Sequence, residues 1–196
     1  MNIIEIENLT FSYPAAGKPI LNNISLQVER GDFLAIVGNN GCGKSTFCKA
    51  LNGLIPHFIS GDFEGKVLVD GLNTLESDVG TLACKAGYVY QDFENQIVRP
   101  TVLDDASFAC LNYAMPDYRE RGKEALTLCG LDGREDDYIW QFPAARPICL
   151  LWPAQCLCAR IYSFLTSLLH SWIPAMRTEF TACCAHSMKN MERPLL

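Results

Sequence analysis

The chain has 196 residues, 49% of them hydrophobic, and a formal net charge of −6 at pH 7. That length and hydrophobic content suffice for one sizeable core with at most a small appended lobe. The acidic balance lacks the basic stripe that marks proteins whose main partner is nucleic acid. The first ten residues alternate apolar and charged side chains, which is typical of a strand and not of a cleaved targeting segment.

Hydrophobic periodicity predicts an alternation of strands and helices along the chain. Strands are expected at 3–10, 24–28, 33–37, 66–69 and 87–90, and helices at 46–54, 102–113 and 118–128. The run 33–37 is continuously apolar, which predicts a strand that is buried on both faces. Leu131-Asp132-Gly133 is expected to close the last helix.

A complete G-x-x-x-x-G-K-[ST] motif lies between a predicted strand and a predicted helix. Its glycines allow backbone N–H groups to converge on a phosphate at the positive end of the helix. Lys44 is expected to reach the β- and γ-phosphates, and the Ser45 hydroxyl to bind Mg²⁺. The alternative is a chance glycine-rich turn. The predicted ATP-binding set of this loop is Gly38, Asn39, Asn40, Gly41, Cys42, Gly43, Lys44, Ser45 and Thr46.

Three other parts of the sequence support this interpretation of the motif: Tyr13 within Phe-Ser-Tyr-Pro, residues 20–38, which lead into the phosphate loop, and the segment 87–97 around Gln91. Together they resemble the ATP-binding subunits of ABC transporters. Segments 51–56, 92–98 and 101–108 are similar to the energy-coupling-factor and cobalt-importer subgroup. The resemblance implies that Tyr13 stacks on adenine and that Gln91 contacts Mg²⁺ and the attacking water. Without it, Tyr13 would be a packing aromatic and Gln91 a solvated surface residue.

The same resemblance implies a fold and a set of partners. The expected fold is an α/β P-loop NTPase of ABC type, with an antiparallel β-subdomain at the amino end, a partial helical subdomain at 104–138 and an incomplete central sheet. Residues 1–145 would form this nucleotide-binding domain. A second ATP-binding subunit, a transmembrane coupling protein and a substrate-binding membrane subunit are the expected partners, at the cytoplasmic face of the cell membrane. Nucleic acid is not an expected partner.

The sequence lacks several groups that ATP hydrolysis needs in this family. Arg146-Pro147-Ile148-Cys149 stands where an L-S-G-G-Q-like signature loop would follow, and no apolar run ending in Asp-Glu comes after residue 145. Neither His170 nor His186 has the setting of a switch histidine. Whether this chain is an ATPase therefore stays open. One alternative is a nucleotide-binding fragment that does not hydrolyse ATP, and another is a different P-loop enzyme such as a nucleotide kinase.

The composition changes near residue 145. All 14 glycines lie at or before Gly133, and only Glu179 and Glu192 of the acidic residues follow residue 146. Of the ten cysteines, five are scattered among the predicted elements, as reduced cytosolic thiols would be (Cys42, Cys48, Cys84, Cys110 and Cys129). The others cluster in 146–196, where their spacing fits no common zinc module. The apolar stretch 161–173 is too short to span a bilayer.

Back-translation suggests a shifted reading frame for 146–196. Trp172-Ile173 requires TGG-ATH, so the frame one base earlier contains GAT, which encodes aspartate. Permitted codons from Leu165 onward then spell Asp-Glu-Pro-Thr-Ser-Phe-Leu-Asp-Pro, a catalytic stretch of the ABC type. In the same frame Met188-Lys189 forces a glutamate and Met191-Glu192 forces a glycine. We therefore interpret 146–196 as out-of-frame translation; the alternative is a novel carboxy-terminal domain.

Overall fold

The computed structural model describes residues 2–30, 32, 34–90, 93–128, 130–141 and 162–165. The chain divides into two compact units, Met1–Tyr88 and Val89–Leu196, and each is described by itself. The expected tail 146–196 lies outside the described residues, apart from the short strand β6 (Tyr162–Leu165).

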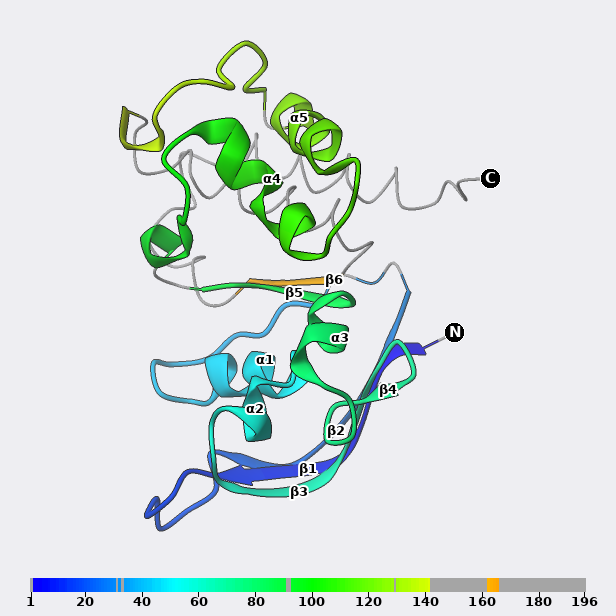
Figure 1. Cartoon of the computed structure of the whole chain (residues 1–196). Helices are drawn as coiled ribbons and strands as arrows, with labels where there is room; N and C mark the ends of the chain where they lie inside the picture. Colours follow the sequence, from blue (N-terminus) through cyan, green and yellow to red (C-terminus); the bar gives the residue numbers. More distant parts are fainter. Residues whose placement is uncertain are drawn as a thin grey trace. The chain divides into compact units, whose positions relative to one another are not determined.

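The first unit is built on a four-stranded antiparallel sheet in the order β2-β1-β3-β4 (Figure 1). Its strands are β1 (Asn2–Ser12), β2 (Leu21–Glu29), β3 (Asp62–Val69) and β4 (Leu72–Asn73). The unit also contains the helices α1 (Lys44–Leu51), α2 (Leu54–His57) and α3 (Val79–Ala83), and the strand β5 (Ala86–Val89) spans its boundary in the sequence. The predicted antiparallel β-subdomain at the amino end is confirmed.

A bulge in β1 sets which side chains face the core. Ile4 and Ile6 are buried before it, and Leu9 and Phe11 are buried after it, so the alternation shifts by one residue. The shift falls at Asn8, whose φ is 52°, and the pairing of β1 with both neighbouring strands is irregular there. Opposite it, a Cβ on Gly65 would lie 2.5 Å from the backbone oxygens of Glu7 and Asn8. The close approach therefore requires glycine.

The core of the first unit lies between this sheet and the helices. Phe47, Ala50 and Leu51 of α1 are buried together with Val67 and Val69 of β3. Figure 1 shows α1 and α2 on one side of the β1–β3 layer. The predicted single helix 46–54 is instead α1 and α2, because Gly53 adopts a left-handed conformation (φ 76°) and interrupts the helix.

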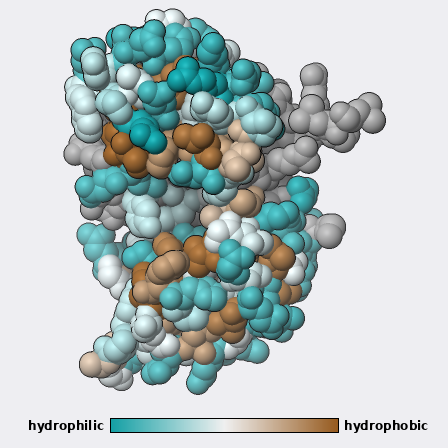
Figure 2. Space-filling view, viewed as in Figure 1, coloured by the Kyte–Doolittle hydropathy of each residue, from teal (hydrophilic) through white to brown (hydrophobic). Residues whose placement is uncertain are grey.

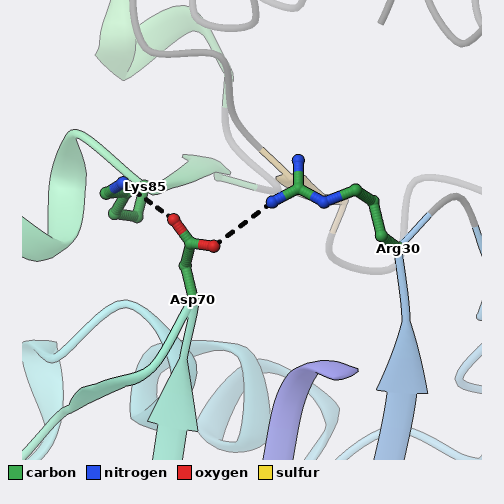
Figure 3. Close-up of polar contacts among 3 residues, drawn as sticks. All are labelled: Arg30, Asp70 and Lys85. Atoms are coloured by element: carbon green, nitrogen blue, oxygen red, sulfur yellow. Dashed lines mark hydrogen bonds and ion pairs between the residues drawn. The ribbon is translucent and has the colours of Figure 1, made fainter. Parts of the chain in front are cut away.

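One carboxylate joins three chain segments at the end of the sheet. Asp70, in the turn between β3 and β4, lies 2.7 Å from Lys85 Nζ and 3.3 Å from Arg30 Nη2 (Figure 3). Arg30 follows β2 and Lys85 follows α3. Because both cationic side chains are substantially exposed, these ion pairs orient the segments more than they stabilise them.

The second unit contains a helix pair, α4 (Val102–Asn112) and α5 (Tyr118–Leu128), with short 3₁₀ helices η1 (Phe93–Gln96) and η2 (Ile139–Gln141). Thr101 caps α4 by accepting a hydrogen bond from the Asp104 N–H. The two helices enclose a core of Val102, Leu103, Ala106, Ala125, Leu126, Leu131 and Ile139. Both helices were predicted from their apolar spacing, and they agree with the prediction to within one residue.

Asp105 anchors the segment that leads into α4. Its Oδ1 accepts hydrogen bonds from the backbone N–H groups of Val98 (2.8 Å) and Arg99 (2.9 Å). The residue is only 8% exposed, and burial raises the pKa of its carboxyl group, against the opposing effect of these hydrogen bonds. Both amides therefore depend on one buried oxygen.

Asp105→Ala is expected to destabilise this segment by about 1–3 kcal/mol, because it leaves two amides without an acceptor. Asp105→Asn retains an oxygen at that position and removes the buried charge, so this substitution should destabilise the segment less than Asp105→Ala does. Hydrogen exchange of the Val98 and Arg99 amides measures the effect directly. Equal protection of both amides in wild type and in Asp105→Ala would contradict this anchoring role.

Candidate functional site

The chain approaches the predicted phosphate loop in an extended, exposed segment. A strand buried on both faces was expected at 33–37, but residues 34–37 form no strand, and Val37 is 84% exposed. The prediction is wrong for these residues. A doubly buried strand needs a neighbour on each side to take its backbone hydrogen bonds, and no strand in the described part of the chain pairs with 34–37.

Two glycines shape the loop where it enters α1. Gly41 and Gly43 have φ of 81° and 97°, values that other residues rarely adopt. Gly43 also packs closely, since a Cβ there would lie 3.0 Å from the Ile20 carbonyl oxygen and 3.2 Å from Leu21 Cδ2. The chain entering β2 therefore forms one wall of the loop, a contact that the motif alone does not predict.

The amino end of α1 suits an anion. Gly43 is its N-cap residue, no side chain accepts a hydrogen bond there, and the first turn carries no acidic residue. The first N–H groups of a helix have no partner within the helix, and the helix dipole makes this end positive. These N–H groups are therefore suited to phosphate oxygens.

Lys44 folds back over the loop. Its Nζ donates to the carbonyl oxygens of Gly38 (2.8 Å) and Asn39 (2.9 Å), and it lies 3.7 Å from Cys42 Sγ. Each contact is exposed to solvent, so the ammonium group belongs to no core and can exchange loop carbonyls for phosphate oxygens. The loop thus holds a positive charge at the place where the motif requires one.

Tyr13 lies close to the same helix. Its hydroxyl is 3.0 Å from Thr46 Oγ1, and its ring meets the ring of Phe11 edge-on, with centroids 5.0 Å apart. The structure therefore brings Tyr13 and the phosphate loop together within one unit. Phe11 is a supporting residue that the sequence did not single out.

The other predicted residues fall into three groups. Asn39, Asn40 and Cys42 are exposed, and Ser45 is half-buried in the first turn of α1, so its role as a Mg²⁺ ligand stays a prediction. Gln91 lies outside the described residues, so its predicted contacts with Mg²⁺ and water stay a prediction. Among the described residues nearby in the sequence, Gln96 Oε1 accepts a hydrogen bond from the Tyr90 N–H (2.8 Å).

The cysteines only partly follow the expectation of reduced thiols. Cys42, Cys48 and Cys84 are free, and burial raises the pKa of the Cys48 thiol to about 11. Cys110 is disulfide-bonded, so the expectation is wrong there. Sequence spacing does not show which distant thiols approach each other. Cys129 and the cysteines of the tail lie outside the described residues. Among the described residues, no cluster of His, Cys, Asp or Glu could hold a metal ion.

Comparison with known protein families decides between the interpretations of this loop as part of an ABC transporter subunit or of another P-loop enzyme. The family model described as ABC transporter matches residues 21–144, which is more than half of the chain. The chain belongs to the ABC transporter family. This match excludes the alternative of a nucleotide kinase. It also confirms the family resemblance from which we interpreted the phosphate loop, Tyr13 and Gln91.

Individual ABC relatives support the subgroup. An ABC transporter ATP-binding protein of Pyrococcus abyssi is 50% identical over 112 residues, 57% of this chain and 40% of that protein. The energy-coupling factor transporter ATP-binding protein EcfA1 of Lacticaseibacillus paracasei is 37% identical over 137 residues, 69% of this chain and 48% of that protein. The chain thus spans half or less of the length of these curated relatives.

A solved structure supports the ABC ATPase fold. The structure of cbiO1 from Clostridium perfringens, described as part of the ABC transporter complex cbiONQ, matches with a TM-score of 0.83 at 24% identity and covers 97% of this chain and 75% of that one. The predicted fold class is confirmed. Within the described residues, no helix has the length and apolar character needed to cross a membrane.

Proposed function

We propose that this chain is an ATP-binding subunit of an energy-coupling-factor-like importer, a class of transporter in which ATP binding and hydrolysis drive transport through membrane partners. The observation that carries the proposal is the loop at the start of α1. Two glycines with positive φ, an uncapped helix end and the Lys44 ammonium converge there. All three features favour a bound polyphosphate.

The residues of the loop and two residues outside it have distinct roles in this proposal. The backbone N–H groups of Gly41 to Lys44 would bind the β-phosphate, Lys44 would neutralise the β- and γ-phosphates, and Ser45 and Gln91 would hold Mg²⁺. When bound, Mg²⁺ neutralises charge on the β- and γ-phosphate oxygens. Tyr13 would contact the face of the adenine ring.

The proposed partners are a second ATP-binding subunit and membrane subunits at the cytoplasmic face of the membrane. The relatives described as transporter ATP-binding proteins support this proposal. Exposed hydrophobic side chains in the first unit also fit protein partners: Phe58 is 74% exposed, and Figure 2 shows further hydrophobic side chains on the face that carries α1, α2 and α3.

A second candidate function is ATP binding without hydrolysis. It is favoured by the sequence after residue 145, which supplies neither a signature loop nor an Asp-Glu pair at the end of an apolar run. The two candidates differ in one measurement, the ATPase activity of the purified chain together with its membrane partner. Hydrolysis above background would exclude the second candidate.

Binding of MgATP to the purified chain, measured by calorimetry, tests the proposal, and Tyr13 tests its adenine contact. Base–aromatic stacking is worth about 1–3 kcal/mol, so Tyr13→Ala is expected to weaken ATP binding roughly tenfold or more. Tyr13→Trp should retain binding because it keeps a flat aromatic face. If neither substitution changes the affinity, Tyr13 serves only packing. A wild-type chain that binds no MgATP would refute the function itself.

A further inference from the structure

The hydrogen bond between Tyr13 and Thr46 links two segments that are 33 positions apart in the chain. The two hydroxyl oxygens are 3.0 Å apart, and either can be the donor. On its other side, the Tyr13 ring meets Phe11 at an interplanar angle of 81°, and Phe11 is fully buried. The ring is therefore held both at its edge and at its hydroxyl.

The bulge in β1 directs Tyr13 toward α1. Ile4 and Ile6 are buried before Asn8, as is Ile3 at the start of the strand, and Leu9 and Phe11 are buried after it. Residues two positions apart in a strand have their side chains on the same face. Tyr13, just beyond the end of β1, therefore has its side chain on the same face as Leu9 and Phe11. If strict alternation continued from Ile4 and Ile6 with no bulge at Asn8, Tyr13 would lie on the opposite face.

Thr46 provides a rigid anchor for the ring. It is 6% exposed and lies in the first turn of α1, directly after Lys44 and Ser45. Its neighbours Phe47 and Cys48 are buried in the core, which fixes the helix against the sheet. A threonine within a helix has few χ1 choices, so its hydroxyl position is well defined.

We propose that Thr46 is a positioning residue for recognition of the nucleotide base. Its hydroxyl holds the Tyr13 ring at a fixed place beside the phosphate loop, so that the groups for base and phosphate form one preorganised unit. A ring that is ordered before binding avoids the loss of side-chain freedom that binding would otherwise cost. This inference rests on the proposed function, since it assumes that the loop binds a nucleoside triphosphate.

The test separates the base from the phosphates. Calorimetric Kd values are measured for MgATP and for magnesium tripolyphosphate, which lacks the base and ribose, and their ratio isolates the contribution of the nucleoside. Changes in direct contacts between Thr46 and phosphate affect both ligands and largely cancel in this ratio. The variants are Tyr13→Phe, Thr46→Val, Thr46→Ser and the double variant Tyr13→Phe with Thr46→Val.

Removing either hydroxyl is expected to reduce the preference for ATP over tripolyphosphate by about threefold to tenfold, the effect of one lost hydrogen bond. The double variant should show the same reduction as each single variant, because one interaction is lost in each case. Thr46→Ser keeps the hydroxyl and should restore the wild-type preference. A merely structural role of Thr46 would not link the two residues in this way.

Two matched controls accompany these variants. Tyr118→Phe removes a tyrosine hydroxyl from α5, and Thr10→Val removes the hydroxyl that accepts a hydrogen bond from the Asn23 N–H in the sheet. Both should keep the wild-type preference. The inference is overturned if Tyr13→Phe and Thr46→Val also keep it, or if their effects add in the double variant.

The inference and the proposed function can fail separately. If Tyr13→Ala lowers the preference for ATP while Tyr13→Phe and Thr46→Val do not, the ring contacts the base and the hydrogen bond to Thr46 is irrelevant. If Tyr13→Ala also leaves the preference unchanged, the adenine contact is refuted together with the inference. Absence of binding of both ligands to the wild-type chain would refute the nucleotide-binding function.

Discussion

Replacing Lys44 with alanine is expected to abolish measurable ATP binding, with an affinity loss of about a hundredfold or more. The Lys44 ammonium is the one side-chain cation of the motif, and each charge-assisted hydrogen bond to phosphate contributes about 1.5–3 kcal/mol. In the structure its contacts are exposed loop carbonyls, those of Gly38 and Asn39. Water can replace the ammonium at these oxygens, so the fold of the first unit should not change.

Lys49 offers a matched control on the same helix. It lies in the last turn of α1, away from the end that faces the loop. Lys49→Ala therefore removes an equal charge from the same helix and should leave ATP affinity within about twofold of wild type, as expected for a screened surface charge. Calorimetry gives the affinities and circular dichroism compares the folds. Unchanged affinity in Lys44→Ala would mean that the loop is not the phosphate site.

Sequence patterns predicted well those elements whose signal is local. The helix α5 begins and ends where the apolar spacing predicted, and α4 ends one residue earlier than expected. Gly41 and Gly43 of the predicted phosphate loop have positive φ values, a conformation that the glycines of this motif permit. In these cases each residue's own conformational preference agrees with the surrounding structure.

The errors arose where structure depends on distant segments. The apolar run 34–37 has the composition of a buried strand, but burial requires neighbours that a local pattern cannot supply. The bulge at Asn8 was missed because strict alternation was expected across β1. The contact of Tyr13 with Thr46 depends on that bulge and on the packing of α1, so sequence reasoning found both residues without finding the bond between them.

Composition and family comparison agree on where the chain changes character. The match to the ABC transporter family ends at residue 144, which lies after the last glycine, Gly133, and before a segment in which Glu179 and Glu192 are the acidic residues. We propose that the residues from about 146 onward result from translation in a shifted frame. Out-of-frame residues were not selected to bury a core, and the apolar stretch 161–173 should make the purified chain poorly soluble.

Restoring the frame by one or two bases near codons 145–151 is expected to convert a chain without ATPase activity into an active one. The restored sequence would encode a signature-like loop and Asp-Glu-Pro-Thr-Ser, whose glutamate can polarise the attacking water. A positioned general base contributes about 10²–10⁴-fold to a rate, so turnover should rise at least a hundredfold above that of the present chain. Phosphate release measured with saturating MgATP gives the comparison.

Lys44→Ala in the restored chain is the control. It should abolish ATP binding and therefore ATP hydrolysis, which would show that the turnover comes from this site. Three findings together would contradict the shifted frame: DNA that encodes the present frame, a tail that resists proteolysis, and ATP hydrolysis by the present chain. Hydrolysis by the present chain would require catalytic groups other than an Asp-Glu pair, since its sequence after residue 145 contains none. ATP binding without hydrolysis before restoration, followed by hydrolysis after it, would separate the two steps: the phosphate loop supplies affinity, and the residues of the other frame supply the chemistry.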